Sequence, residues 1–310
     1  MGRLPLVSVI MNCLNCEKYV KEAIDSVYAQ TYPNWEIIFW DNASTDKSAE
    51  IAESYDERLR YFRSSETVPL GKARNWALEK AKGKYIAFLD CDDVWLPKKL
   101  EKQIPLFERN PRIGLVYSNT IFYNQNSGRI RRCYRFRYPP RGKIFRALLS
   151  DYFLSMETVV IKKESLNSLT EWFDERFNVI EEADLFIRIC YHWEADYVNE
   201  PLAVWRIHDE SWTWTRSELF GKELEMMLEK YRKLYPDFEN RFKKEIKRKK
   251  AKIAYWKAIM EWRKGNEKKL QNILKPYLFS DLRLLVIYVI SFLLSYKQYF
   301  RLYKLLRWQV

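Results

Sequence analysis

The first half of the chain alternates short apolar runs with segments whose apolar residues have helical spacing. The apolar runs lie at 6–12, 35–40, 59–62 and 85–89, and the helical segments between them at 17–29, 46–55 and 71–82. A further helical segment, 97–108, begins at Pro97, a residue that the first turn of a helix tolerates. Repeated strand–helix units predict a parallel sheet covered by helices on both faces, and therefore an α/β fold.

The second half of the chain continues this order and then changes. Further strands are expected at 114–123, 158–161 and 203–207, and a helix at 182–192. After residue 216 the pattern is helical throughout. In open α/β sheets, ligands bind beyond the carboxyl ends of the strands, so residues just after each strand are the ones to search for chemistry.

Charge is divided unevenly along the chain. The formal net charge is +13, from 54 Lys and Arg against 41 Asp and Glu. Residues 216–310 hold 24 of the basic and 10 of the acidic residues, whereas residues 1–215 are nearly balanced. This predicts a globular body over 1–215, with halves of about 1–110 and 111–215, and a basic helical region over 216–310. A balanced body argues against nucleic acid as its partner.

Composition excludes several other classes. With 47% hydrophobic residues the chain can bury a sizeable core, which excludes dominant disorder. It has no uncharged apolar run of about 18 residues, so no ordinary spanning helix is expected. The N-terminal segment leads directly into a strand without a cleavage site, so no signal peptide is expected. Five cysteines, including the pair Cys13 and Cys16, predict reduced and mostly buried thiols, with a thioredoxin-like motif as the alternative.

Three acids follow the apolar run at 85–89. Side chains two apart in an extended segment point the same way, so Asp90 and Asp92 face one point and Asp93 faces another. Neighbouring carboxylates repel one another unless a cation lies among them, and oxygen ligands favour Mg²⁺ or Mn²⁺. The acids therefore predict a divalent cation site. An acidic turn with a helix cap before Pro97 is the alternative.

Asp41 follows the apolar run at 35–40. The Ser, Thr and Asp residues after it suit a helix cap, but Asp41 comes before that cap and is not needed for it. Its carboxylate could accept from a base N–H or a ribose hydroxyl. Turn chemistry is the alternative explanation.

Taken together, three segments resemble the family 2 inverting nucleotide-sugar glycosyltransferases, which have the GT-A fold. They are LVSVIMNCLN, EIIFWDNASTD and LGKARNWALEKAKGKYIAFLDCDDVWLPKKLEKQ. The resemblance is strong over 6–103 and looser to 212. Cys13–Leu14 and Asn42–Ala43 depart from the family's usual residues. The expected architecture is a Rossmann-like, mostly parallel sheet with helices on both faces and a C-terminal helical extension, the catalytic domain being 1–215.

The resemblance implies a metal-dependent inverting transfer. The donor would be a nucleoside-diphosphate sugar, with UDP favoured, and the acceptor a hydroxyl of a glycan or lipid-linked molecule in bacterial-type surface polysaccharide assembly. Asp41 would recognise the base, and Asn15 and Arg74 would line the nucleotide pocket. Asp90 and Asp92 would form the DxD pair that holds Mn²⁺ or Mg²⁺, with Asp90 also beside the donor.

A later acid cluster, Glu181, Glu182 and Asp184, resembles the family's acidic pair ahead of a helix. Inverting transfer needs a carboxylate that removes a proton from the acceptor hydroxyl. By position we expect Glu182, where the family usually has Asp, to be this base. Glu181 is the second member of the pair and Asp184 the next candidate. First-turn acids that stabilise a helix N-terminus are the alternative.

The segment 205–212 resembles the family's late Arg-x-His-x-x-Ser element. His208 would ligate the metal or contact a phosphate, and Arg206 would offset the charge of the leaving group on the donor side. A structural role is the alternative for a lone histidine.

Residues 129–146 contain eight Lys or Arg, no acid, and four interleaved aromatic residues. Three explanations stay open for this stretch. It could bind nucleic acid, contact the pyrophosphate of a lipid-linked acceptor, or form an exposed, solvated hairpin.

The basic region carries an apolar run at 284–294, which is too short to span a membrane. Arg283, Lys297, Arg301 and nearby Tyr and Trp residues flank it, and a charged run lies at 243–252. Such a pattern is typical of an interfacial anchor on anionic lipid. We therefore expect a cytoplasmic protein, peripheral on the inner face of the plasma membrane. A buried helix packed on the body or on a second subunit is the alternative.

Two rival functions come from other classes. The chain could be a non-catalytic binding or scaffold module on a degenerate transferase fold, although its complete set of acids argues against this. A nucleotidyltransferase is the nearer rival. That function would require a glycine-rich phosphate loop, and the eight glycines of this chain are not clustered.

Overall fold

The computed structural model describes residues 4–134, 139–209 and 215–307, and the side chains among them up to residue 302. Its contacts divide the chain into two compact units. Unit 1 consists of residues 1–148 and 152–211, and unit 2 of residues 149–151 and 212–310.

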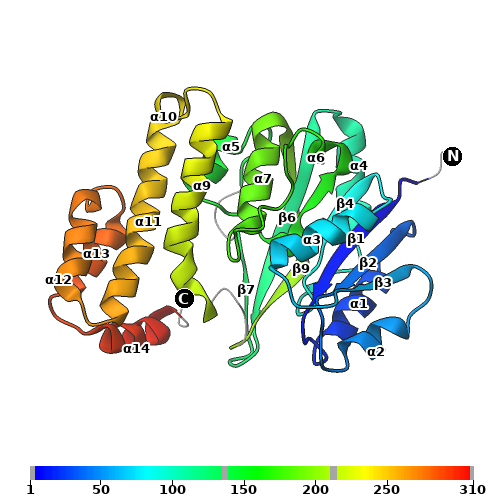
Figure 1. The fold of residues 1–310 in the computed structure, drawn as a ribbon, viewed down its shortest axis with the longest axis horizontal. Coiled ribbons are helices and arrows are strands. Elements are labelled where there is room, and N and C mark those ends of the chain that lie inside the picture. The colour runs from blue at the N-terminus through cyan, green and yellow to red at the C-terminus, as the bar shows by residue number, and fades with distance from the viewer. Residues whose placement is uncertain (1–3, 135–138, 210–214, 308–310) are drawn as a thin grey trace. The chain divides into compact units, whose positions relative to one another are not determined.

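Unit 1 contains one mixed sheet, in the order β3-β2-β1-β4-β8-β6-β9-β5, with β7 paired to β6 (Figure 1). The strands are β1 Val7–Cys13, β2 Trp35–Asp41, β3 Leu59–Arg63, β4 Tyr85–Phe88, β5 Val94–Trp95, β6 Ile113–Asn124, β7 Arg129–Arg132, β8 Val160–Lys162 and β9 Glu194–Ile207. Strands β1 to β4 are parallel to one another. Strand β8 is antiparallel to both β4 and β6, which makes the sheet mostly rather than entirely parallel.

Helices cover both faces of this sheet because side chains alternate along each strand. The helical segments are α1 Val20–Tyr28, α2 Ser48–Glu53, α3 Leu70–Lys80, α4 Lys99–Arg109, α5 Phe145–Ser150, η1 Met156–Thr158, α6 Lys163–Leu166 and α7 Glu181–His192. Val7, Val9 and Met11 of β1 share a core cluster with the buried residues of α1 and α4. On β4, Phe88 packs instead against Phe186 of α7, with ring centroids 5.7 Å apart.

Unit 2 is helical within the described residues. Its segments are η2 Ser217–Leu219, α9 Phe220–Leu234, α10 Phe238–Arg241, α11 Lys243–Arg263, α12 Glu267–Leu274, η3 Lys275–Tyr277, α13 Leu282–Ile290 and α14 Tyr296–Arg307. Trp262 of α11, Leu270 of α12 and Leu284 and Ile287 of α13 form the centre of its buried cluster. Figure 1 shows α12 and α13 beside the lower part of α11. Among the described helices, none is both long enough and apolar enough to cross a membrane.

Several element boundaries differ from the sequence expectation. Strand β9 begins at Glu194, nine residues before the expected start at 203, and β5 was not anticipated. Both escape a pattern search because β9 alternates buried and half-exposed residues and β5 has only two residues. In the basic stretch, β7 pairs with β6 as an exposed hairpin, and residues 135–138 lie outside the described part.

Candidate active site

The carboxyl ends of β1, β2 and β4 lie side by side at one edge of the sheet. Registers pair Cys13 with Asp41 across β1 and β2, and Ile10 with Phe88 across β1 and β4. The residues that follow these strands therefore meet at a common edge, where open α/β sheets bind ligands. The expected acids after β2 and β4 both belong to this edge.

Asp41 is fully buried at the end of β2. Its carboxylate accepts hydrogen bonds from the backbone N–H of Ser44 at 2.7 Å and from the Tyr61 hydroxyl at 2.7 Å. Arg63 forms an ion pair with it at 3.0 Å and also donates to the carbonyl of Ser44. Neither Tyr61 nor Arg63 was anticipated from the sequence, because nothing in the pattern of β3 marks them as partners of an acid on β2.

Asn15 connects the loop after β1 to the loop after β2. It has a left-handed backbone conformation with φ of 55°, which asparagine tolerates better than most residues. Its N–H donates to Ser44 Oγ at 3.0 Å, and its side-chain oxygen accepts from Thr45 N–H at 2.8 Å. Both residues expected at the base-binding end, Asn15 and Asp41, thus contact the same turn.

Arg74 of α3 joins two acid clusters that are far apart in sequence. Its guanidinium is buried and donates to Asp90 Oδ1 at 2.8 Å and to Glu181 Oε1 at 2.5 Å. A buried arginine between two carboxylates is strongly held, since removing one partner of such a pair typically costs about 3–5 kcal/mol. Arg74 was expected to line the nucleotide pocket; here it connects Asp90 after β4 to Glu181 at the start of α7.

Glu182 lies next to Glu181 but has a different environment. Its carboxylate accepts a hydrogen bond from the Tyr152 hydroxyl at 3.2 Å. The pKa of Glu182 is raised to about 8. The largest cause is its recessed position, followed by the negative charge of Glu181 and, more weakly, by the charges of Asp90 and Glu157. Arg74 has the opposite effect. A carboxyl group with such a pKa is suited to proton transfer near neutral pH.

Asp184 is placed differently from the pair before it. It is completely buried and forms an ion pair with Arg188, one turn further along α7, at 2.8 Å. Arg188 also donates to the carbonyl of Glu171 at 2.7 Å. These contacts hold the buried Asp184 carboxylate to the next turn of α7.

Asp92 and Asp93 point to different partners, as their spacing predicts. Asp92 Oδ2 lies 2.9 Å from His208 Nε2. Asp93 is buried and accepts from the backbone N–H of Arg206 at 2.9 Å, which ties the acidic loop to β9. The Arg206 guanidinium donates to the Asp92 carbonyl at 2.9 Å and to Glu22 Oε2 at 2.6 Å. Arg206 therefore holds the acidic loop in place; residues 210–214 of the same motif lie outside the described part.

The side chains of Asp92 and His208 fit a hard divalent cation. Their facing oxygen and nitrogen atoms are ligand types found at Mg²⁺ and Mn²⁺ sites, and Asp92 keeps 29% of its side chain exposed. Such sites commonly use one or two protein ligands together with substrate phosphates. Among the described residues, no group of three or more His, Cys, Asp or Glu side chains is arranged to hold a metal. Asp90, expected as a further ligand, has one carboxylate oxygen engaged by Arg74 instead.

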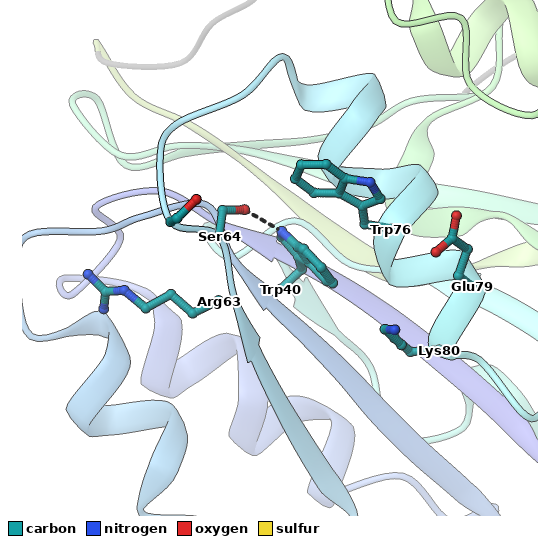
Figure 2. A pocket seen from close by; sticks show the side chains of 7 residues that line it. Trp40, Arg63, Ser64, Trp76, Glu79 and Lys80 are labelled. Carbon is teal, nitrogen blue, oxygen red and sulfur yellow. Dashed lines mark hydrogen bonds between the residues drawn. The ribbon is translucent and has the colours of Figure 1, made fainter.

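A separate pocket lies among residues of β2, the end of β3 and α3. Figure 2 shows its lining, in which the Trp40 indole donates to Ser64 Oγ at 2.8 Å and faces Trp76 of α3. The pocket is lined by Trp40, Arg63, Ser64, Ser65, Trp76, Glu79 and Lys80. Arg63 belongs both to this lining and to the ion pair with Asp41, so the pocket adjoins Asp41 rather than the acids after β4.

Solved structures place this architecture in a known class. A mannosyltransferase of Pyrobaculum calidifontis in complex with GDP-Man and Mn²⁺ aligns with a TM-score of 0.61 at 16% identity, over 95% of this chain and 83% of that one. S. aureus TarS in complex with UDP-GlcNAc aligns with a TM-score of 0.60 at 18% identity, over 81% of this chain and 71% of that one. The fold is therefore that of the GT-A glycosyltransferases.

The chain belongs to glycosyl transferase family 2, whose sequence model matches residues 8–170. An uncharacterised glycosyltransferase of Methanocaldococcus jannaschii is 34% identical over 66% of this chain and 71% of its own length. The Escherichia coli UDP-Glc:α-D-GlcNAc-diphosphoundecaprenol β-1,3-glucosyltransferase WfgD is 35% identical over 52% of this chain and 62% of its own length. The expected family and fold are thereby confirmed.

Proposed function

We propose that the chain is a metal-dependent inverting glycosyltransferase that moves a sugar from a nucleoside-diphosphate donor, UDP-type favoured, to an acceptor hydroxyl. The observation that carries this proposal is the buried Arg74, which connects Asp90 at the donor edge to Glu181 beside Glu182. That connection joins the candidate donor site to Glu181, and the candidate base Glu182 is the next residue of α7. The rigid placement of reacting groups is itself a large part of catalysis.

The donor's nucleotide would lie at the ends of β1 and β2. Asp41 and the turn held by Asn15 offer a carboxylate and backbone groups for the base and ribose. Asp92 and His208 would hold Mn²⁺ or Mg²⁺ at the diphosphate. When bound, such a cation neutralises the diphosphate and stabilises it as a leaving group. Arg206 supports this arrangement by holding the acidic loop to β9.

Glu182 would remove the proton of the acceptor hydroxyl. Glu181 cannot replace it easily, because its carboxylate is committed to Arg74. The raised pKa of Glu182 favours a base that can take a proton from the attacking hydroxyl. Attack opposite the leaving diphosphate inverts the anomeric carbon, so the product should have the opposite anomeric configuration to the donor.

The acceptor is proposed to be a glycan or lipid-linked saccharide in surface polysaccharide assembly. The E. coli relative's name includes a UDP-linked donor and a diphosphoundecaprenol-linked acceptor, which supports this class. A lipid-linked acceptor would in turn require the protein to work at a membrane surface, for which we propose the inner face of the plasma membrane.

The test compares Glu182→Gln with the wild type. Nucleotide release is measured with UDP-, GDP- and dTDP-sugars, Mn²⁺ and a GlcNAc-diphospholipid acceptor, and donor binding is measured by calorimetry. We expect Glu182→Gln to lose about 10²- to 10⁴-fold in transfer, the usual contribution of a general base, while donor affinity is kept.

Asp184→Asn is the matched control, since it also neutralises one acid on α7. It should lower thermal stability through the lost pair with Arg188 rather than abolish turnover in the fraction that stays folded. Normal transfer by Glu182→Gln would contradict the assignment of the base. Failure of every sugar donor to bind would favour a scaffold role instead.

A further inference from the structure

Helix α13 of unit 2 is apolar on two opposite faces. Its inner face, with Leu284 and Ile287, is buried in the cluster formed with α11 and α12. Its outer face carries Leu282, Val286 and Val289, four and three residues apart, and these side chains are 74%, 46% and 50% exposed. A helix that only completed a helical bundle would be expected to show polar residues on its outer face.

The exposed apolar surface continues into the turns at both ends of α13. Phe279, three residues before Leu282, is fully exposed, and Phe292 and Leu293 after the helix are 61% and 76% exposed. Together with Leu282, Val286 and Val289 they form what we call the outer apolar face. These six residues account for most of the large exposed hydrophobic side chains among the described residues of the chain. Single exposed hydrophobic residues are ordinary, but a contiguous set marks an interaction site.

Basic residues are in excess in the segment that carries the outer apolar face. The segment 275–302 contains four basic residues and one acidic residue, and Arg283, Lys297 and Arg301 in it are exposed. Asp281, the single acid, is paired with Arg283 at 2.6 Å and also caps α13 through the N–H of Arg283. Tyr288, Tyr296 and Tyr299 of the same segment are half-buried. Apolar, aromatic and basic side chains occur together in this way on helices that lie in a membrane interface.

We infer that the outer apolar face of α13 docks on an anionic lipid surface, with the helix lying in the interface. A nine-residue helix is only about 14 Å long, so α13 can enter the headgroup boundary but cannot cross a hydrocarbon core of about 30 Å. The basic residues beside it complement anionic headgroups, and each one near the surface contributes favourably to binding.

A second copy of the chain is the main alternative occupant. A two-fold contact through the same face would bring the two sets of basic residues together, and like charges facing each other disfavour association. Anionic lipid removes that conflict. The inference stands on unit 2 alone and does not depend on the catalytic proposal, which concerns residues of unit 1.

Flotation with phosphatidylglycerol-rich vesicles at low salt tests this inference, with phosphatidylcholine vesicles as the neutral comparison. We expect the wild type to float with the anionic vesicles and to be released by salt. Leu282→Glu should bind at least about tenfold more weakly, since it puts a charge in place of an exposed apolar side chain that would enter the lipid. Lys297→Gln with Arg301→Gln should weaken binding to anionic vesicles only.

Leu234→Glu is the matched control, because Leu234 is an exposed leucine of the same unit at the end of α9, outside the outer apolar face. It should float like the wild type. Equal flotation of Leu282→Glu and wild type, or no flotation of the wild type, would overturn the inference. The inference would also be overturned if light scattering showed a dimer of the wild type and a monomer of Leu282→Glu. Nucleotide release by Leu282→Glu without vesicles should equal that of the wild type, which keeps this test apart from that of the catalytic proposal.

Discussion

At the scale of single residues, Glu181 and Glu182 show how neighbouring acids acquire different properties. Successive residues of a helix point about 100° apart, so the two carboxylates face different surroundings. Glu181 forms an ion pair with Arg74, whereas the Glu182 carboxylate accepts a hydrogen bond from the Tyr152 hydroxyl. The second carboxylate is therefore the one whose proton affinity is raised.

We predict that transfer depends on pH through Glu182. The groups that face this residue are Tyr152, Glu181, Arg74, Asp90 and Glu157, and their net effect together with desolvation raises its pKa to about 8. A base must be deprotonated to act, so kcat/KM of the free enzyme should fall as the pH drops below about 8 and level off above it. Initial rates of nucleotide release across this range measure the effect.

The residual activity of Glu182→Gln provides the control, because it should lack the same acidic limb. A wild-type profile that is flat from about pH 6 to about pH 9 would contradict this prediction.

At the scale of elements, the junction between α3 and β4 depends on a close approach of two backbones. Gly83 N–H donates to Ser8 Oγ at 2.8 Å, and Ser8 in turn donates to Glu36 at 2.6 Å. Glu36 also accepts from Lys82 N–H at 2.8 Å, so β1, β2 and the start of β4 are joined at the end of the sheet opposite the site. A Cβ on Gly83 would lie 2.5 Å from the backbone nitrogen of Ser8.

We therefore predict that Gly83→Ala destabilises unit 1. The new methyl group would meet backbone rather than the flexible end of a side chain, so β1 and β4 would have to move apart. Overpacking of this kind typically costs about 1–3 kcal/mol. Denaturant unfolding followed by tryptophan fluorescence measures the change in the free energy of unfolding.

Gly221→Ala is the matched control. Its Cβ would lie 3.2 Å from Lys257 Cγ, a much longer distance than the 2.5 Å at Gly83, and Gly221 lies in helix α9, where alanine is favoured. Equal destabilisation by the two substitutions would mean that the backbone contact at Gly83 is not what matters.

At the scale of the whole molecule, the chain combines a nearly neutral unit with a strongly basic helical one. The candidate site in unit 1 is assembled from the ends of β1, β2, β4 and β9 and from the first turns of α3 and α7. A ligand that binds such a site in the folded state, and not the unfolded chain, raises stability.

We predict that UDP with Mn²⁺ raises the melting temperature more than either does alone. At a ligand concentration of one hundred times Kd, the gain in the free energy of unfolding is about 2.7 kcal/mol. The added effect of Mn²⁺ should disappear with a chelator and in Asp92→Ala, because Asp92 is the proposed ligand. A scan of thermal unfolding by fluorescence measures these shifts.

Single-stranded RNA at two salt concentrations is the control for nonspecific binding to the basic unit, and its effect should fall with salt. Stabilisation by RNA that persists at high salt, with none by UDP and Mn²⁺, would contradict the prediction.

Much of the architecture could be predicted because it depends on local patterns. The alternating strands and helices from β1 to α4, the acids after β2 and β4, and the acidic start of α7 all follow from spacing along the chain. Strands β5 and β9 were missed or shortened, since a two-residue strand has no pattern and a strand with one partly solvated face has a weak one. The pairing of the candidate residues could not be predicted in the same way.

The sequence alone determined the family, the order of the elements and which acids to examine, because each of these depends on residues that are close together along the chain. Only the tertiary structure decided that Arg74 lies between Asp90 and Glu181, that Asp184 is used by Arg188, and that Asp92 faces His208. The Arg74 and Asp92 pairs join residues from different elements, whereas Asp184 and Arg188 lie one turn apart on α7 and are both buried there. The exposure of the outer apolar face of α13 was also decided by the tertiary structure, because an apolar run does not show which face of the helix is buried in the core.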